Sequence, residues 1–293
     1  MVSEFIRDIR EGILEIDTKR DAGLTTPKEI ERIDDICYGK DDKWQVLDVY
    51  RPKGYSEKLP VIVSVHGGGW VYGDKEIYQF YCMDLAKRGF AVVNFTYRLA
   101  PEFKYPAQIE DTNTVFTWVL AHADEYDFDL DRMYAVGDSA GGHLLSVYCT
   151  ACNSDTYQDV LGIKITGKLP RAVALNCGVY FMDFVDGDAE DLSLMKELLK
   201  DKGSELEVKQ INPLPYMTID FPKAYVMVAN DDHRVAGIQA KKLSERLDEL
   251  HASYEMKIYG SETNKLDHVF HLQIRTKDAT DCNDDECDFF QKN

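Results

Sequence analysis

Short apolar runs that alternate with segments of helical period constrain the fold of this chain more than any other feature. Apolar strands that alternate with helices are typical of a parallel sheet covered by helices on both faces, so we expect such a sheet. The runs are Val61–Val65, Ala91–Tyr97, Met133–Val136, Ala172–Leu175, Ala224–Ala229 and Tyr254–Ile258, and the helical segments between them include Tyr78–Arg88, Ile109–Ala123, His143–Ala151 and Ala236–His251. Trp44–Tyr50 alternates differently and is predicted to be an early, antiparallel strand near the sheet edge. The sequence therefore predicts an α/β protein with a mixed, mostly parallel sheet.

The charge balance narrows the classes of partner. The 293 residues include 34 Lys+Arg and 52 Asp+Glu, which gives a net charge of −18. Such a charge repels phosphate backbones and anionic lipids, so we expect no nucleic acid and no membrane partner. No apolar stretch is long enough to span a bilayer. The first residues lack the basic and apolar regions of a signal peptide, and the seven cysteines have no regular spacing, so we expect reduced thiols in the cytoplasm.

Two regions do not fit the alternation of strands and helices. Residues 1–40 precede the first expected strand, and residues 179–222 separate two later ones. We expect a single domain over 1–293, with these two regions as a small helical cap or lid; a solvated surface helix is the alternative for the second. The first is predicted to contain an amphipathic helix whose apolar positions are Val2, Phe5, Ile6, Ile9, Ile13 and Ile16. The second holds the acids Asp183, Asp186, Asp188, Glu190 and Asp191, a helix-like segment near Leu192–Leu199 and a break at 212–215.

The strongest local motif is Gly137-Asp138-Ser139-Ala140-Gly141. It follows a predicted strand directly and precedes a predicted helix, which is the context of a nucleophile elbow. The flanking glycines permit a turn that is too tight for Cβ atoms, and such a turn exposes the hydroxyl of Ser139. Ser139 is therefore the candidate nucleophile.

A second motif, His66-Gly67-Gly68-Gly69-Trp70, follows the strand Val61–Val65. Consecutive glycines let backbone N–H groups approach a substrate carbonyl, as an oxyanion hole requires. The residue after the nucleophile, Ala140, supplies another donor in this kind of fold. Phosphate-binding patterns fail, because Asp74 occupies the lysine position of a P-loop and Tyr72 occupies the third glycine of a dinucleotide motif.

A serine nucleophile needs a base and an acid that orients it, in the chain order Ser, Asp/Glu, His. Asp231 and Asp232 follow the strand Ala224–Ala229, and His268 and His271 follow the strand Tyr254–Ile258. Each pair lies where the acid and the base belong. A zinc site from Cys149/Cys152 or from His268/His271 with Cys282/Cys287 is an alternative that we disfavour, so no metal and no cofactor are expected. The acids Asp281, Asp284, Asp285, Glu286 and Asp288 are predicted to form a solvated helix face.

Together these motifs resemble the hormone-sensitive-lipase-like branch of α/β-hydrolase esterases. The resemblance spans residues 45–275 and rests on 66–70, on Tyr97–Glu102 with Pro106, Ala107 and Asp111, on 137–142, and on His268-Val269-Phe270. It implies an α/β-hydrolase fold, Ser139 as nucleophile, His268 as base and the N–H groups of Gly68, Gly69 and Ala140 as oxyanion donors. The family usually has Asp-Pro-Leu at its acid, whereas this chain has Asp232-His233-Arg234. Counting from the end of the strand favours Asp232 over Asp231.

The expected activity is hydrolysis of small, short-chain acyl esters through Ser139, His268 and Asp232, with an acyl-enzyme intermediate. A carbohydrate acetyl or feruloyl esterase and a serine peptidase are alternatives. A non-catalytic receptor with this fold is disfavoured, since a candidate exists for every member of the triad. The substrate is expected to be a small-molecule ester, and homo-oligomerisation stays open.

Overall fold

The computed structural model describes residues 2–182, 189–235 and 237–293. Asp183, Asp186 and Asp188 of the predicted acidic stretch lie outside the described residues, as does Ala236, the first residue of a predicted helix. In the described ranges no helix is long and apolar enough to cross a membrane.

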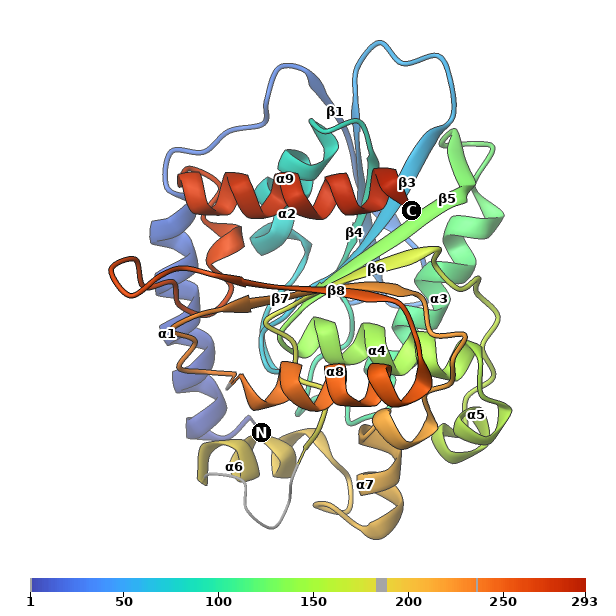
Figure 1. Cartoon of the computed structure of the whole chain (residues 1–293), viewed down its shortest axis with the longest axis vertical. Helices are drawn as coiled ribbons and strands as arrows, with labels where there is room; N and C mark the ends of the chain where they lie inside the picture. The colour runs from blue at the N-terminus through green and yellow to red at the C-terminus, as the bar shows by residue number, and fades with distance from the viewer. Residues whose placement is uncertain (1, 183–188, 236) are drawn as a thin grey trace.

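An eight-stranded sheet forms the centre of the molecule, with the strand order β1-β2-β4-β3-β5-β6-β7-β8 (Figure 1). The strands from β4 to β8 in that order run parallel to one another, whereas β2 is antiparallel to both β1 and β4. The strands are β1 Ile30–Cys37, β2 Val46–Pro52, β3 Leu59–Val65, β4 Ala91–Phe95, β5 Phe128–Asp138, β6 Ala172–Asn176, β7 Lys223–Ala229 and β8 Tyr254–Tyr259. The predicted parallel core is confirmed, because every predicted apolar run forms one of these strands.

Helices cover both faces of the sheet. In Figure 1, α2 and α9 lie on one face, and α3, α4 and α8 lie on the other. Each face has its own apolar cluster, in which Phe290 of α9 packs on the first side and Leu144 of α4 on the second. The helices are α1 Glu4–Asp21, α2 Lys75–Ala86, α3 Ala107–Ala121, α4 Ala140–Cys152, α5 Asp155–Leu161, α6 Ala189–Leu198, α7 Glu205–Ile211, α8 Ile238–Leu250 and α9 Lys277–Lys292, with short 3₁₀ turns η1 Leu214–Tyr216 and η2 Phe270–Leu272.

The expectation that residues 1–40 precede the first strand is wrong. Residues 30–37 form β1, which is the edge strand of the sheet, so this part of the predicted cap belongs to the sheet. The sequence does not predict β1, because the outer side chains of this strand are charged and exposed. The preceding helix α1 is amphipathic as predicted, although Ile16 is 65% exposed and does not belong to its buried face.

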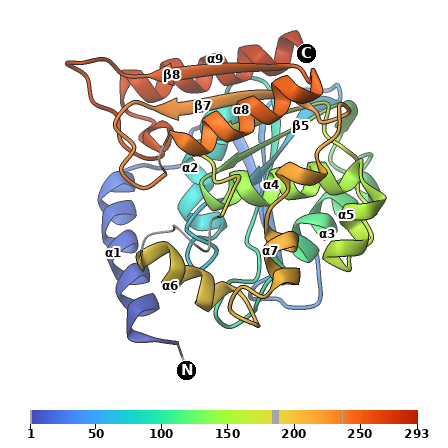
Figure 2. The ribbon, with the colours of Figure 1, turned by 60° about the horizontal axis from the view of Figure 1, so that its bottom comes forward.

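Between β6 and β7 the chain forms α6 and α7, which lie together at one end of the molecule, with α6 beside α1 (Figure 2). α7 begins with a capping box in which Ser204 and Glu207 satisfy each other's backbone N–H groups. The predicted helix near Leu192–Leu199 corresponds to α6, whereas α7 was not predicted.

Candidate active site

Ser139 occupies a sharp turn between β5 and α4. Its φ of +50° lies in the left-handed region, which is costly for a residue with a side chain and is commonly retained at functional sites. The turn is held from β6, because the N–H of Ser139 donates to the carbonyl of Asn176 at 3.0 Å and the N–H of Val179 donates to the carbonyl of Ser139 at 3.2 Å. The side chain of Ser139 is therefore presented at the carboxyl end of the central strands.

The two glycines that flank this turn have no room for a side chain. A Cβ on Gly137 would lie 2.6 Å from the carbonyl oxygen of Gly141, and one on Gly141 would lie 2.0 Å from the carbonyl oxygen of Val65. Backbone therefore packs directly on backbone, and the start of α4 rests against the end of β3. This is the physical reason for the glycines of the motif.

The glycine loop that follows β3 lies next to the nucleophile turn. Gly68 and Gly69 have φ values of +101° and +60°, and a Cβ on Gly68 would lie 2.2 Å from the carbonyl oxygen of Tyr72. The carbonyl of Gly68 accepts from the N–H of Tyr72 at 2.9 Å, which turns that carbonyl into the loop. Ala140 is the first residue of α4, so its N–H is one of the first-turn groups without an acceptor inside the helix. These are the donors that the sequence predicts for an oxyanion.

A tyrosine that the sequence did not single out ties this loop to the nucleophile turn. The N–H of Gly67 donates to the hydroxyl of Tyr78 at 2.9 Å, and that hydroxyl donates to the carboxylate of Asp138 at 2.7 Å. Burial raises the pKa of Asp138 to about 6, although the hydrogen bond from Tyr78 opposes the rise. Tyr78 lies in an apolar helix, where nothing in the sequence marks its hydroxyl as functional.

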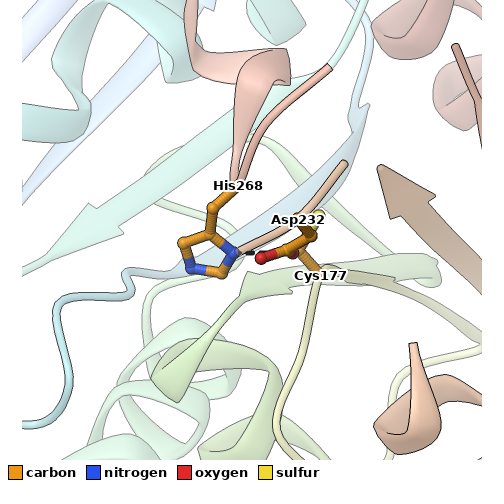
Figure 3. Close-up of side chains that lie close together, drawn as sticks. All are labelled: Cys177, Asp232 and His268. Carbon is orange, nitrogen blue, oxygen red and sulfur yellow. Dashed lines mark hydrogen bonds and ion pairs between the residues drawn. The ribbon is translucent and has the colours of Figure 1, made fainter. Parts of the chain in front are cut away.

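The candidate base and acid form a hydrogen-bonded pair (Figure 3). Nδ1 of His268 lies 2.8 Å from Oδ2 of Asp232, whose side chain is 3% exposed, against 16% for His268. The other carboxylate oxygen accepts the N–H groups of Arg234 at 2.9 Å and Val235 at 2.7 Å. Burial alone would raise the pKa of Asp232, but the hydrogen bond and charge of His268 outweigh it and hold the pKa below its usual value. With its Nδ1–H given to the carboxylate, His268 keeps Nε2 as a proton acceptor.

The alternative acid, Asp231, and the alternative base, His271, lie outside this hydrogen-bonded pair. Asp231 faces the solvent side, 3.3 Å from Nε2 of His233 and 3.8 Å from Nζ of Lys265. His271 lies in η2 and is fully buried, with its ring edge-on to that of Tyr81 and the ring centroids 5.1 Å apart. Burial lowers the pKa of His271 to about 3. Of the two doubled pairs, Asp232 and His268 are the ones that contact each other.

The loop 177–179 connects the nucleophile turn with this pair. At one end it binds Ser139 through the N–H of Val179. At the other end the sulfur of Cys177 is grouped with the ligand atoms of Asp232 and His268, all within 4.8 Å of one another, as Figure 3 shows. β5, β6 and β7 are adjacent strands whose carboxyl ends meet here. The three candidate triad residues therefore gather around one loop.

Comparison with known protein families assigns this chain to a family. Residues 47–247, more than half of the chain, match the BD-FAE family. The chain belongs to the BD-FAE family. Esterase LipC of Mycobacterium tuberculosis is 36% identical over 222 residues, which are 72% of this chain and 54% of that protein. Carboxylesterase NlhH of the same species is 38% identical over 129 residues, 42% of this chain and 40% of that protein. The chain thus spans about half the length of the curated relatives it matches.

Almost the whole chain of this BD-FAE family member superimposes on a solved structure. Esterase B from Lactobacillus rhamnosis, inhibited by a tributyrin phosphonate, superimposes with a TM-score of 0.89 at 25% identity, over 99% of this chain and 96% of that one. The fold is that of an α/β-hydrolase, and the predicted likeness to esterases of the hormone-sensitive-lipase-like branch is confirmed.

Cys177 was not predicted as part of the site. In the described part of the chain, Cys177, Asp232 and His268 form the one group of three or more His, Cys, Asp or Glu side chains whose ligand atoms lie close enough to hold a metal ion. Burial and the adjacent Asp232 raise the pKa of the Cys177 thiol, which opposes the thiolate that a metal ligand requires. The two zinc ligand sets considered from the sequence are not assembled among the described residues.

Proposed function

We propose that this chain is a carboxylesterase that uses Ser139 as nucleophile, His268 as base and Asp232 as the acid that orients the base. The observation that supports this best is the 2.8 Å contact of Asp232 with Nδ1 of His268. Ser139 occupies the strand-to-helix turn with a φ of +50°, and the loop 177–179 contacts both that turn and the pair. Family membership adds support, since the relatives named above are esterases.

In the proposed reaction, Nε2 of His268 takes the proton of the Ser139 hydroxyl as the oxygen attacks the ester carbonyl. Asp232 holds the imidazole in the required tautomer and stabilises its positive charge. The N–H groups of Gly68, Gly69 and Ala140 stabilise the negative oxygen of the tetrahedral intermediate. His268 then protonates the leaving alcohol, and a water molecule activated by the same histidine hydrolyses the acyl-enzyme. None of these steps uses a cofactor.

We propose acyl chains of about two to six carbons as the preferred substrates. Support comes from α6, because the side chain of Leu194 lies 3.2 Å from the position that a Cβ on Gly69 would take. The cap helix therefore restricts the space beside the oxyanion loop. Esterase B, which has the same fold, is inhibited by a C4-C4 tributyrin phosphonate.

Turnover of p-nitrophenyl acetate, butyrate, hexanoate and dodecanoate tests this proposal. We expect the highest kcat/KM on the esters of two to six carbons and complete inhibition by a serine-directed phosphonate. Faster hydrolysis of long-chain triglyceride emulsions would overturn the chain-length preference alone. Failure to hydrolyse any ester, with peptide bonds cleaved instead, would overturn the esterase proposal and favour the peptidase alternative.

We propose a small-molecule ester as the partner and no binding of nucleic acid, because the net charge is −18. A cytoplasmic location is proposed from the seven cysteines, all of which are free thiols. Cell fractionation tests the location. The homo-oligomeric state is a separate hypothesis that light scattering decides.

A further inference from the structure

His143 makes two hydrogen bonds that join three parts of the molecule. It lies on α4, four positions after Ser139, and is fully buried. Its Nδ1 lies 3.1 Å from Nε1 of Trp70, and its Nε2 lies 2.8 Å from the carbonyl oxygen of Ile211. The rings of His143 and Trp70 meet edge-on, with centroids 5.3 Å apart.

These partners determine the protonation of His143. An indole N–H only donates and a carbonyl oxygen only accepts, so Nδ1 must accept from Trp70 and Nε2–H must donate to Ile211. Burial lowers the pKa of His143 to about 4, which keeps this neutral form through the range in which the esterase would work. Both ring nitrogens are occupied. His143 therefore has no free lone pair with which to act as a base.

The three joined parts all border the candidate site. Trp70 directly follows Gly69 in the oxyanion loop, and the N–H of His143 donates to the carbonyl of Ser139 at 3.2 Å. Ile211 is the last residue of α7, the second helix between β6 and β7. The hydrogen bonds of His143 thus connect the oxyanion loop, the nucleophile helix and the cap.

The end of α7 rests on buried polar side chains. The last carbonyls of a helix lack partners inside it and must find others. The carbonyl of Gln210 accepts the hydroxyls of Tyr105 at 3.1 Å and Tyr157 at 2.8 Å, while Ile211 accepts from His143. The two tyrosines support the cap through Gln210, whereas His143 also holds Trp70.

We propose that His143 is a positioning residue that fixes the oxyanion loop against the nucleophile helix by holding Trp70, with the cap as its third support. This inference rests on the proposed esterase function. Since oxyanion donors act in the transition state, loss of the His143–Trp70 contact should lower kcat and kcat/KM together and leave KM nearly unchanged. A residue that only seated the cap would change KM instead.

The test compares three variants with wild type on p-nitrophenyl butyrate. His143→Phe keeps a ring but removes both hydrogen bonds, Trp70→Phe removes the donor, and His143→Gln keeps one acceptor and one donor at about the spacing of the imidazole nitrogens. Loss of one oxyanion donor costs roughly 10²–10³ in kcat, so we expect displacement of the loop to cost about 10–100-fold in His143→Phe and in Trp70→Phe. KM should change less than about threefold, and His143→Gln should recover to within about fivefold of wild type.

Two further comparisons make the test specific. The double variant His143→Phe/Trp70→Phe should have a kcat no lower than that of the slower single variant, because both changes break the same contact. His122→Phe is the matched control, since His122 stacks on Trp118 with centroids 4.4 Å apart at the end of α3, near the start of β5. We expect that control to keep wild-type kcat.

The outcomes separate the inference from the function on which it rests. An inactive wild type would overturn the proposed function. The proposed function stands if wild type is active and Ser139→Ala is inactive. If the His143 and Trp70 variants then keep the wild-type kcat, or only raise KM, the positioning role alone is overturned. Additive losses in the double variant would also overturn it. If His143→Phe does not fold, the kcat of Trp70→Phe and His143→Gln decides the matter in the same way.

Discussion

Replacing Glu286 by glutamine should stabilise the protein at alkaline pH. Glu286 lies on α9 with 0% exposure and accepts hydrogen bonds from the hydroxyl of Tyr81 at 2.9 Å and the side-chain amide of Asn176 at 2.6 Å. The backbone carbonyl of Asn176 in turn accepts the N–H of Ser139, so this carboxylate lies behind the nucleophile turn. Burial raises its pKa from the usual 4.5 to about 7, although both hydrogen bonds oppose the rise.

The sign and size of the effect follow from this pKa. A raised pKa means that folded protein binds the proton more tightly than unfolded protein, so stability is lost as the pH rises from about 4.5 through about 7. At 1.36 kcal/mol for each tenfold change in proton affinity, the charged carboxylate costs about 3 kcal/mol above pH 8. Glutamine has the same shape and cannot ionise. With its amide oxygen toward Nδ2 of Asn176, glutamine can direct its amide nitrogen at the hydroxyl of Tyr81, which can accept a hydrogen bond.

Urea unfolding of wild type and Glu286→Gln at pH 5, 7 and 8.5 measures this effect. We expect free energies of unfolding that agree within about 1 kcal/mol at pH 5, and a variant that is more stable by about 2–3 kcal/mol at pH 8.5. Glu245→Gln on α8 is the control, because Glu245 is an exposed glutamate. The reasoning fails if Glu286→Gln lowers stability equally at every pH, or if wild type is the more stable protein at pH 8.5.

Three other predictions concern the site. Asp232→Asn should lose on the order of 10⁴ in kcat, whereas Asp231→Asn should keep more than about a tenth of wild-type kcat because it contacts His233 and Lys265 instead of the base; the reverse result would move the acid by one residue. Tyr78→Phe should lower kcat about 10-fold or more with little change in KM, because the N–H of Gly67 loses its acceptor; an unchanged kcat would refute the role of this contact. Dialysis against EDTA should leave the esterase rate unchanged, and a loss that zinc restores would contradict the metal-free assignment.

The parallel core could be predicted because its inner strands are buried on both faces, whereas the edge strand β8 is largely exposed. Ala172–Leu175 is an unbroken apolar run and Val61–Val65 is interrupted only by Ser64, and the structure extends each by only one or two residues. β1 could not be predicted in the same way, since an edge strand with charged outer side chains resembles a surface loop in sequence. α7 is a short helix without an apolar stripe that periodicity could detect.

The candidate site was predictable where a motif carries its own backbone geometry, as the flanking glycines of Ser139 do. Roles that depend on tertiary contacts were not predictable. The acids of the last helix were expected to form a solvated face, and this is wrong for Glu286, which is fully buried. Cys177, Tyr78 and His143 contact neighbours that are distant in sequence, and nothing in the local pattern distinguishes them from ordinary core residues.

Covalent labelling by a short-chain p-nitrophenyl phosphonate tests the central claim most directly. Mass spectrometry should find one phosphonyl group per chain, attached to Ser139, with loss of esterase activity in proportion to labelling. Ser139→Ala should stay unlabelled and inactive while unfolding like wild type, and His268→Ala should label at a rate lower by several powers of ten, because triad members act as a unit. A label on any other residue, or an active Ser139→Ala protein, would contradict the assignment of Ser139 as the nucleophile.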